Sequence, residues 1–292
     1  MKIQAELVID AKSILGGNPY WDEQTQTLCW VDLMDSKVYT YSPETHTNRW
    51  LEVNQYVGAY LPRRNGGAVI ALQTGVYLLQ PHTKEVVPVF SSDPNQAENR
   101  FICGKCDPAG RFWAGTSDLE GKRPWGTLYC MNHDHTLRPV LVNATLPWGM
   151  AWSPDGRMMY FIDSPTREIV AFDFCLETGS LDRKRVVAEF PEGAGWPAGM
   201  TVDEEGKLWV AHWGGARVSR WDPVTGRLLA TVNLPVSQVT ACVFGGAQLD
   251  ELYITTGRYL LNEKELVRQP QAGGVFKVKP GFKGLPAPKF AG

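Results

Sequence analysis

Cys103 and His212 are the two side chains whose types could carry covalent chemistry in this sequence. A thiolate is a strong nucleophile when a base or a positive charge lowers its pKa. Arg100 and Lys105 are close to Cys103 in sequence, and His212 lies in the segment LWVAHWGG, on a predicted strand, where a ring nitrogen could serve as the base. The pair predicts attack on an ester. The alternative is a small inert thiol beside a structural histidine.

Other reactive patterns in the sequence are weak. Cys103 and Cys106 have redox spacing, but the segment enters a predicted strand rather than opening a helix, and no second ligand pair has zinc spacing. The chain has no Gly-x-Ser-x-Gly elbow and no Gly-rich phosphate loop. The remaining histidines fall in predicted outer turns: His46, His82, His133 and His135.

Composition and charge narrow the class of protein. Hydrophobic residues make up 43% of the 292 residues and charged residues 21%, which predicts a large core. A formal net charge of -2 gives no electrostatic case for nucleic acid or an anionic membrane as a partner. No apolar run approaches the roughly 20 residues that span a bilayer, and the start lacks a signal-peptide core. We therefore expect a cytoplasmic monomer whose six cysteines are free thiols.

Two alternating sequence elements repeat six times along the chain. The first is a turn followed by a short apolar strand, at 27–32, 63–72, 107–116, 153–163, 203–212 and 247–257. The second is a strand that ends in a turn, at 37–46, 75–84, 127–136, 168–179, 217–226 and 274–284. A period of roughly 40–50 residues is typical of propeller blades.

These repeats predict an all-β fold, a six-bladed β-propeller forming a single domain over residues 1–292. The strand segments are rich in Val, Ile, Tyr, Phe and Trp, and no long helical period separates them. The opening segment AELVID is expected to complete the sheet that the last repeat begins.

Four segments carry a family resemblance: RFICGKCDPAGRFWAGT, GMAWSPDGRMMYFID, AGMTVDEEGKLWVAHWGG, and VTACVFGG with QPQAGGVFKVKPG. Through them the chain resembles the senescence-marker-protein/gluconolactonase/luciferin-regenerating family over essentially its whole length. The resemblance implies a six-bladed propeller, a lactonase or related hydrolase, and one divalent cation at the channel mouth. It also implies a small-molecule ester or lactone as the partner.

The positions that hold the cation in that family carry no ligand in this sequence. Where the family motifs have Glu, Asn, Asn and Asp, this chain has Gly17, Ile102, Trp148 and Ala198. Hard cations need several oxygen ligands, and Asn18 could add only one amide oxygen. We therefore expect no metal at this place, no other cofactor, and little metal-dependent lactonase activity.

The departures from the family pattern concentrate at the channel mouth, whereas blade turns and strand cores match. Random drift would spread more evenly, so this distribution favours deliberate redesign of the pocket, with natural loss of the metal as the alternative. The new lining predicts an apolar, aromatic pocket suited to a flat aromatic ligand. The residues expected to contact substrate are Gly17, Asn18, Arg100, Ile102, Trp148, Trp196, Ala198 and Tyr259.

Further residues have a weaker claim to the pocket. The resemblance implies that Ser117, Asp118 and Glu120 lie in a loop overhanging it, and Arg258 could donate hydrogen bonds beside Tyr259. Two tryptophans could lie near the pocket, Trp125 and Trp213. For Trp209 and Trp213, however, packing between blades is the preferred interpretation, because both lie inside predicted strands.

Three functions follow, in order of preference. The first is metal-free, cysteine-dependent hydrolysis of activated aromatic esters, with Cys103 as nucleophile and His212 as base. The second is a catalytically silent propeller that binds a small apolar ligand. The third is a metal-dependent lactonase that recruits substitute ligands.

Overall fold

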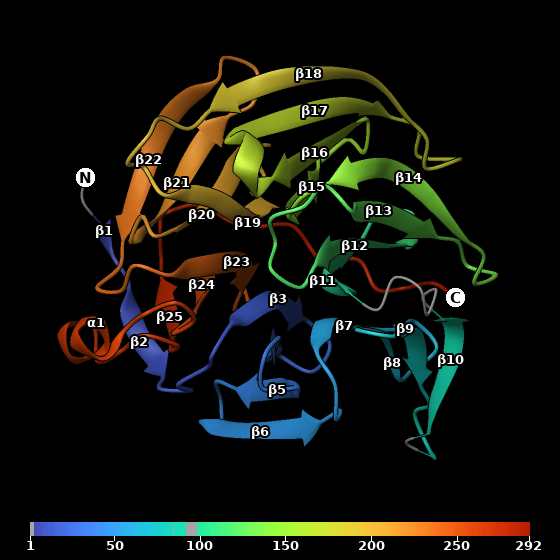
Figure 1. Cartoon of the computed structure of the whole chain (residues 1–292), viewed down its shortest axis with the longest axis horizontal. Helices are drawn as coiled ribbons and strands as arrows, with labels where there is room; N and C mark the ends of the chain where they lie inside the picture. The colour runs from blue at the N-terminus through green and yellow to red at the C-terminus, as the bar shows by residue number, and fades with distance from the viewer. Residues whose placement is uncertain (1–2, 84, 92–97) are drawn as a thin grey trace.

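The computed structural model describes residues 3–83, 85–91 and 98–292, which form six small sheets around a central channel (Figure 1). Within each blade, neighbouring strands are antiparallel. The predicted all-β, six-bladed β-propeller is therefore confirmed. Residue 84, the last of the predicted segment 75–84, lies outside the described residues.

Apart from β1 and β2, the strands of the six blades follow one another along the chain, and each blade begins at the channel and ends at the rim (Figure 1). The first blade contains β3 (Gly16–Asp22), β4 (Thr27–Asp32), β5 (Lys37–Ser42) and β6 (Thr47–Glu52). The second contains β7 (Val57–Pro62), β8 (Ala68–Leu72), β9 (Gly75–Leu79) and β10 (Val86–Ser91). The third contains β11 (Asn99–Cys106), β12 (Phe112–Asp118), β13 (Gly126–Met131) and β14 (Leu137–Ala144). The fourth contains β15 (Pro147–Trp152), β16 (Met158–Asp163), β17 (Glu168–Phe174) and β18 (Leu181–Glu189). The fifth contains β19 (Trp196–Val202), β20 (Leu208–Trp213), β21 (Arg217–Asp222) and β22 (Arg227–Asn233). The sixth contains β23 (Val239–Gly245), β24 (Glu251–Thr256), β25 (Val275–Val278) and β2 (Glu6–Ile9).

The two ends of the chain close the ring. β2 pairs antiparallel with β25, placing Leu7 opposite Phe276, as predicted for the opening segment. β1 (Ile3–Gln4) adds in parallel to the outer strand β22. The sixth blade is thus built from both ends of the chain, which pairs the edge that β25 would otherwise expose.

A buried aspartate fixes the turn between the first two strands in two blades. Asp203 accepts hydrogen bonds from Trp209 Nε1 at 2.9 Å and from Arg220 Nε at 2.7 Å. Asp107 has the same position and role in the turn between β11 and β12. Trp209 is completely buried and its ring packs edge-on against Phe244, which confirms its predicted role in blade packing.

Helices are scarce in this fold. The structure has a 3₁₀ turn, η2 (Ser164–Thr166), and a short helix, α1 (Glu263–Arg268), in the long connection between β24 and β25. No helix of the described residues is long and apolar enough to cross a bilayer.

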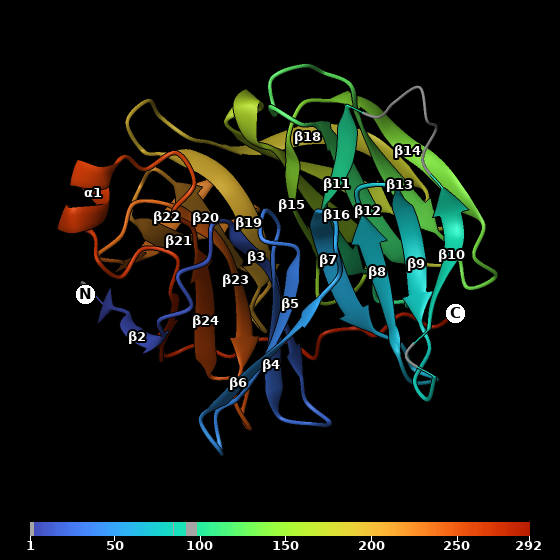
Figure 2. The same cartoon turned by 60° about the horizontal axis from the view of Figure 1, so that its bottom comes forward.

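The segment after β25 crosses the ring on the side away from the mouth cavity described below (Figure 2). It contacts the turn of the fifth blade, where Glu204 N donates to Lys283 O at 2.9 Å. It then reaches the second and third blades, where Phe290 N donates to Pro62 O at 3.0 Å and Ala291 N to Gly110 O at 3.0 Å. The tail therefore ties distant blades together across the channel.

Candidate functional site

A cavity of about 230 Å³ opens at one mouth of the channel. Two aspartates at the ends of second strands fix the loops that form its wall. Asp32 accepts hydrogen bonds from the backbone N–H groups of Ile14 and Leu15, at 2.7 and 3.0 Å. Asp163 does the same for the loop before β15, accepting from Leu146 N at 2.6 Å. Leu15 and Leu146 both line the cavity, so its wall is preorganised by backbone hydrogen bonds.

β-Bulges explain how positions far apart in sequence gather at this mouth. All six innermost strands shift register near their start. A bulge inserts an extra residue and re-aims its side chain. Ile102, Trp148 and Ala198 fall in three of these bulges, and Gly17 begins a fourth. Ile102, Trp148 and Ala198 are therefore equivalent places on three blades, and Gly17 comes directly before the corresponding bulge of a fourth.

The side chains at these bulges do not fit a hard divalent cation. Ile102 and Ala198 are buried hydrocarbon, Gly17 has no side chain, and the indole N–H of Trp148 can only donate. Across the described part of the chain, no cluster of three His, Cys, Asp or Glu side chains could hold a metal ion. The donor chemistry of the family site is thus missing.

Arg100 brings a positive charge to the wall of the cavity. The side chain comes from the start of β11 and the residue is only 8% exposed. Its guanidinium donates to Leu119 O at 3.3 Å and to Met34 Sδ at 3.1 Å, and it lies 4.7 Å from the Tyr56 ring centroid. Nε has no partner, and no carboxylate of the described residues forms an ion pair with this group. Burial lowers the pKa of Arg100, because desolvation disfavours the charged form.

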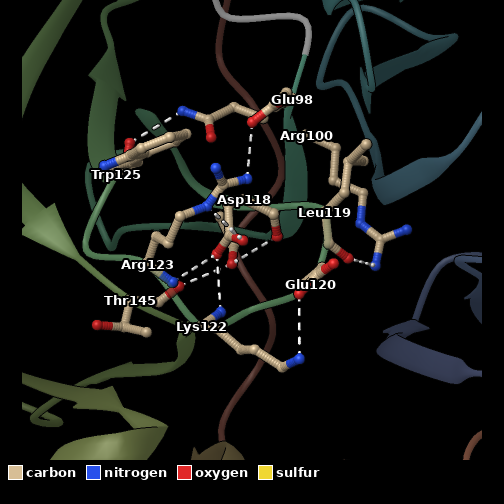
Figure 3. A network of polar contacts seen from close by, with 11 residues as sticks. Glu98, Arg100, Asp118, Leu119, Glu120, Lys122, Arg123, Trp125 and Thr145 are labelled. Carbon is tan, nitrogen blue, oxygen red and sulfur yellow. Dashed lines mark hydrogen bonds and ion pairs between the residues drawn. The ribbon is translucent and has the colours of Figure 1, made fainter.

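Asp118 does not neutralise Arg100. Its carboxylate accepts hydrogen bonds from the backbone N–H groups of Lys122 and Arg123, at 2.8 and 2.9 Å, and pairs with the Arg123 side chain at 3.3 Å (Figure 3). The Arg100 guanidinium instead turns toward Leu119 (Figure 3). These bonds lower the pKa of Asp118 against the opposing effect of its burial, and its charge acts on Arg100 only through space, without a hydrogen bond.

Three other residues of this loop region differ in where they lie relative to the cavity. Ser117 lines the cavity, but its hydroxyl donates to Thr145 O at 2.7 Å. Glu120 lines the rim, with its side chain 67% exposed and paired with Lys122. Trp125 does not line the cavity; it is 51% exposed and stacks under the Arg123 guanidinium.

Aromatic side chains form the apolar walls. Trp148 and Trp213 lie with ring centroids 5.9 Å apart, and both line the cavity with Trp196 and Tyr259. The structure thus places Trp213 at the site, where sequence reasoning preferred packing between blades. Its position at the end of β20, opposite Trp196 at the start of β19, is the signal that register could have supplied. Arg258 does not line the cavity, although its neighbour Tyr259 does.

Three predicted contacts lie away from this cavity. Asn18 donates to the backbone oxygens of Gly58 and Ile102 and accepts from Gly104 N, so its amide joins inner strands instead of facing a ligand. Gly17 and Ala198 do not line the mouth cavity. Ala198 is fully buried in the cluster against which Trp148 packs, so it supports that indole from behind.

The structure does not bring Cys103 to the mouth cavity. The residue lies within strand β11 and is 1% exposed. Its thiol donates to Pro147 O at 2.9 Å, and burial raises its pKa to about 12. A thiol in this state carries almost no thiolate near neutral pH.

His212 engages other partners. One ring nitrogen lies 2.7 Å from Ala194 O and the other contacts the Ser219 hydroxyl. The ring packs edge-on against Phe190, and burial lowers its pKa to about 4. No hydrogen bond joins His212 to Cys103, both of which are described residues. The catalytic pair stays a prediction that this geometry does not favour.

A second, smaller cavity of about 50 Å³ lies within the channel itself. Cys103 and Lys105 line it together with Ala287 and Pro288 of the C-terminal tail. Trp148 lines both cavities, so its indole separates the mouth from the channel. The sequence analysis did not single out Lys105 as a site residue.

Comparison with known proteins agrees with this architecture. The SMP-30/Gluconolactonase/LRE-like region matches residues 15–258. Regucalcin from Danio rerio is 38% identical over 294 residues, covering 99% of each chain. A Bacillus subtilis (strain 168) relative with the provisional name sugar lactone lactonase YvrE is 34% identical over 290 residues, again covering 99% of each. The structure of a luciferin-regenerating enzyme superposes with a TM-score of 0.92 at 31% identity, covering 98% of this chain and 99% of that one. The chain therefore belongs to the SMP-30/gluconolactonase/LRE-like family.

Proposed function

We propose that the mouth cavity binds a small aromatic or alicyclic ester, lactone or carboxylate, with Arg100 receiving its carbonyl or carboxylate oxygens. In this proposal the guanidinium of Arg100 supplies the positive charge of the site. The origin of the replaced residues, by redesign or by natural loss, does not alter this chemistry.

The observation that carries the proposal is a buried arginine at the cavity wall that forms no ion pair with any residue in the described part of the chain. A guanidinium has five N–H donors, and the contacts of Arg100 engage two of them, one through a weakly accepting sulfur. A cation held in such surroundings gains most from a ligand oxygen that carries negative charge. An ester carbonyl offers part of that charge, and the carboxylate formed by hydrolysis offers all of it.

The other residues that line the mouth cavity determine which kind of ring it accepts. Trp148, Trp196, Trp213 and Tyr259 provide ring faces, whereas Ser117 and Asp118 are already committed to backbone partners. A sugar lactone brings several hydroxyl groups that need hydrogen-bond partners when buried. The cavity therefore favours an apolar ring over a polyhydroxylated one.

Slow hydrolysis is the expected accompaniment of binding. Arg100 would stabilise negative charge on the carbonyl oxygen as water attacks. Cysteine-dependent hydrolysis, the first preference from sequence, is now the weaker proposal, because Cys103 is buried and His212 engages other partners. Its test is intact-mass analysis after brief exposure to an activated aromatic ester; one acyl group on Cys103 would establish it.

The test of the main proposal is calorimetric titration with three matched ligands in the presence of a chelator. These are dihydrocoumarin, the hydroxy acid formed when it is hydrolysed, and the neutral amide of that acid. We expect the acid to bind more tightly than the amide, and glucono-δ-lactone to bind least. A charge-assisted contact worth about 1.5–3 kcal/mol corresponds to roughly a 10- to 150-fold difference.

Two variants make the test specific. Arg100→Met should abolish the preference for the acid, while Arg227→Met, an exposed arginine on β22, should leave it unchanged. Equal binding of acid and amide by the unmodified protein would refute the proposal.

A further inference from the structure

Lys105 places a primary amine in the channel cavity, below the indole of Trp148. Its Nζ donates to two backbone oxygens, Met200 O at 3.0 Å and Met150 O at 3.3 Å. The side chain lines the channel cavity and keeps part of its surface open to it. The amine is therefore held in a fixed position inside the propeller.

No negative charge among the described residues accompanies this amine. Lys105 forms no ion pair there, and the titratable groups that share its cavity walls are thiols, Cys103, Cys106 and Cys242, with the Tyr20 phenol. Burial raises the pKa of all four groups, so they are neutral near pH 7. Desolvation accordingly lowers the pKa of Lys105 to about 8.

The two backbone acceptors suit a neutral amine. An unprotonated lysine has two N–H bonds and one lone pair, and Met150 O and Met200 O can take both N–H bonds. The lone pair then points away from both oxygens. A desolvated lysine with a free lone pair is the arrangement that Schiff-base chemistry requires.

We propose that Lys105 is a carbonyl-reactive amine that captures short, uncharged aldehydes in the channel cavity as an imine. The nitrogen lone pair attacks the carbonyl carbon, an N–C bond forms, and a proton moves from nitrogen to oxygen to give a carbinolamine. The C–O bond then breaks, water leaves with the second proton of the amine, and the C=N bond forms. The sequence of steps is redox-neutral.

The cavity sets the class of aldehyde. Its volume of about 50 Å³ admits a molecule of very few heavy atoms and excludes an aromatic ring. A carboxylate-bearing aldehyde would bring negative charge against the backbone oxygens of Met150 and Met200. This site is independent of the proposed function, because Trp148 separates the two cavities.

The test is reductive trapping of the unmodified protein at pH 7 with acetaldehyde and sodium cyanoborohydride, followed by peptide mapping. With a pKa of about 8 against the ordinary 10.5, Lys105 has about 300 times more unprotonated amine at pH 7 than a surface lysine. We expect ethylation of Lys105 at least about 10-fold faster than of Lys184, an exposed lysine on β18. Mapping separates both from the α-amino terminus.

Three controls sharpen the result. Benzaldehyde should fail to label Lys105, because a ring does not fit the cavity. Lys105→Arg should lose the fast product, whereas Lys184→Arg and Arg100→Met should keep it. At pH 10 the selectivity should shrink, since surface amines then lose their protons as well. Labelling of surface lysines with Lys105 unmodified, or equal labelling by both aldehydes, would overturn the proposal even if the ligand titrations at the mouth succeed.

Discussion

Restoring Glu, Asn, Asn and Asp at positions 17, 102, 148 and 198 should create calcium-dependent stability where the parent protein has none. The structure makes the cost of three of the four changes explicit. Ile102→Asn removes a 4% exposed apolar side chain, and Ala198→Asp puts a carboxylate at a fully buried position, which costs several kcal/mol without a cation. At Gly17 a new Cβ would lie 3.0 Å from a methyl group of Leu33, which can shift. The metal-free variant should therefore be clearly less stable than the parent.

Calcium should recover part of that loss. A ligand at 100 times its Kd stabilises the native state by about 2.7 kcal/mol. With an unfolding entropy of about 2.1 cal/mol/K per residue, that corresponds to a rise in Tm of about 4 °C for a protein of this size. The assay is differential scanning calorimetry with and without calcium, after the chelator has been removed.

A matched variant with Asn instead of Asp at position 198 isolates the charge, and it should gain much less from calcium. The reasoning would be refuted by two results. One is a parent protein whose Tm rises with calcium by a similar amount, which would mean that other groups hold the ion. The other is a folded fourfold variant that ignores calcium, which would mean that the bulge positions are not the family's ligand positions.

Three further predictions concern buried groups. Asp203→Ala leaves Arg220 without its buried partner and should cost about 3–5 kcal/mol in urea denaturation, whereas an unchanged midpoint would show that Glu205 suffices. Burial lowers the pKa of His212 from 6.5 to about 4, so between these pH values the unfolded chain binds a proton that the native chain does not. The free energy of unfolding should therefore fall as pH drops from about 6.5 to 4. His212→Gln should flatten this pH dependence in thermal denaturation. Iodoacetamide at pH 8 should modify the exposed Cys175 and spare Cys103, and prompt labelling of Cys103 would favour the thiol hydrolase again.

The blades were predictable because turn chemistry and strand composition recur at a fixed period. In three blades the turn between the first two strands contains a glycine with positive φ. These glycines are Gly110, Gly156 and Gly206, with φ angles of 91°, 66° and 74°. The pairing of the opening segment with β25 was also predictable, since six repeats left one strand missing at the last sheet.

The orientation of side chains at the mouth was not predictable, because the bulges are invisible in the sequence. Strict alternation from Arg100 would place Cys103 and Ile102 on fixed opposite faces, but the register shift between Phe101 and Cys103 changes which side chain meets the channel. The partners of His212 are likewise a tertiary outcome, since Ala194 and Ser219 follow no spacing rule that would reveal them.

The pairing of β2 with β25 has a consequence for folding during synthesis. Leu7 pairs with Phe276, so the ring cannot close on a ribosome until residue 276 has been synthesised and has left the exit tunnel. Until then β2 has no partner and the first and last blades present open flanks, where another nascent chain could add a strand. Such long-range closure is slow compared with hairpin formation. During that interval the nascent propeller needs protection of its strand edges, as chaperones provide, and a fusion that delays release of the segment around β25 would prolong it.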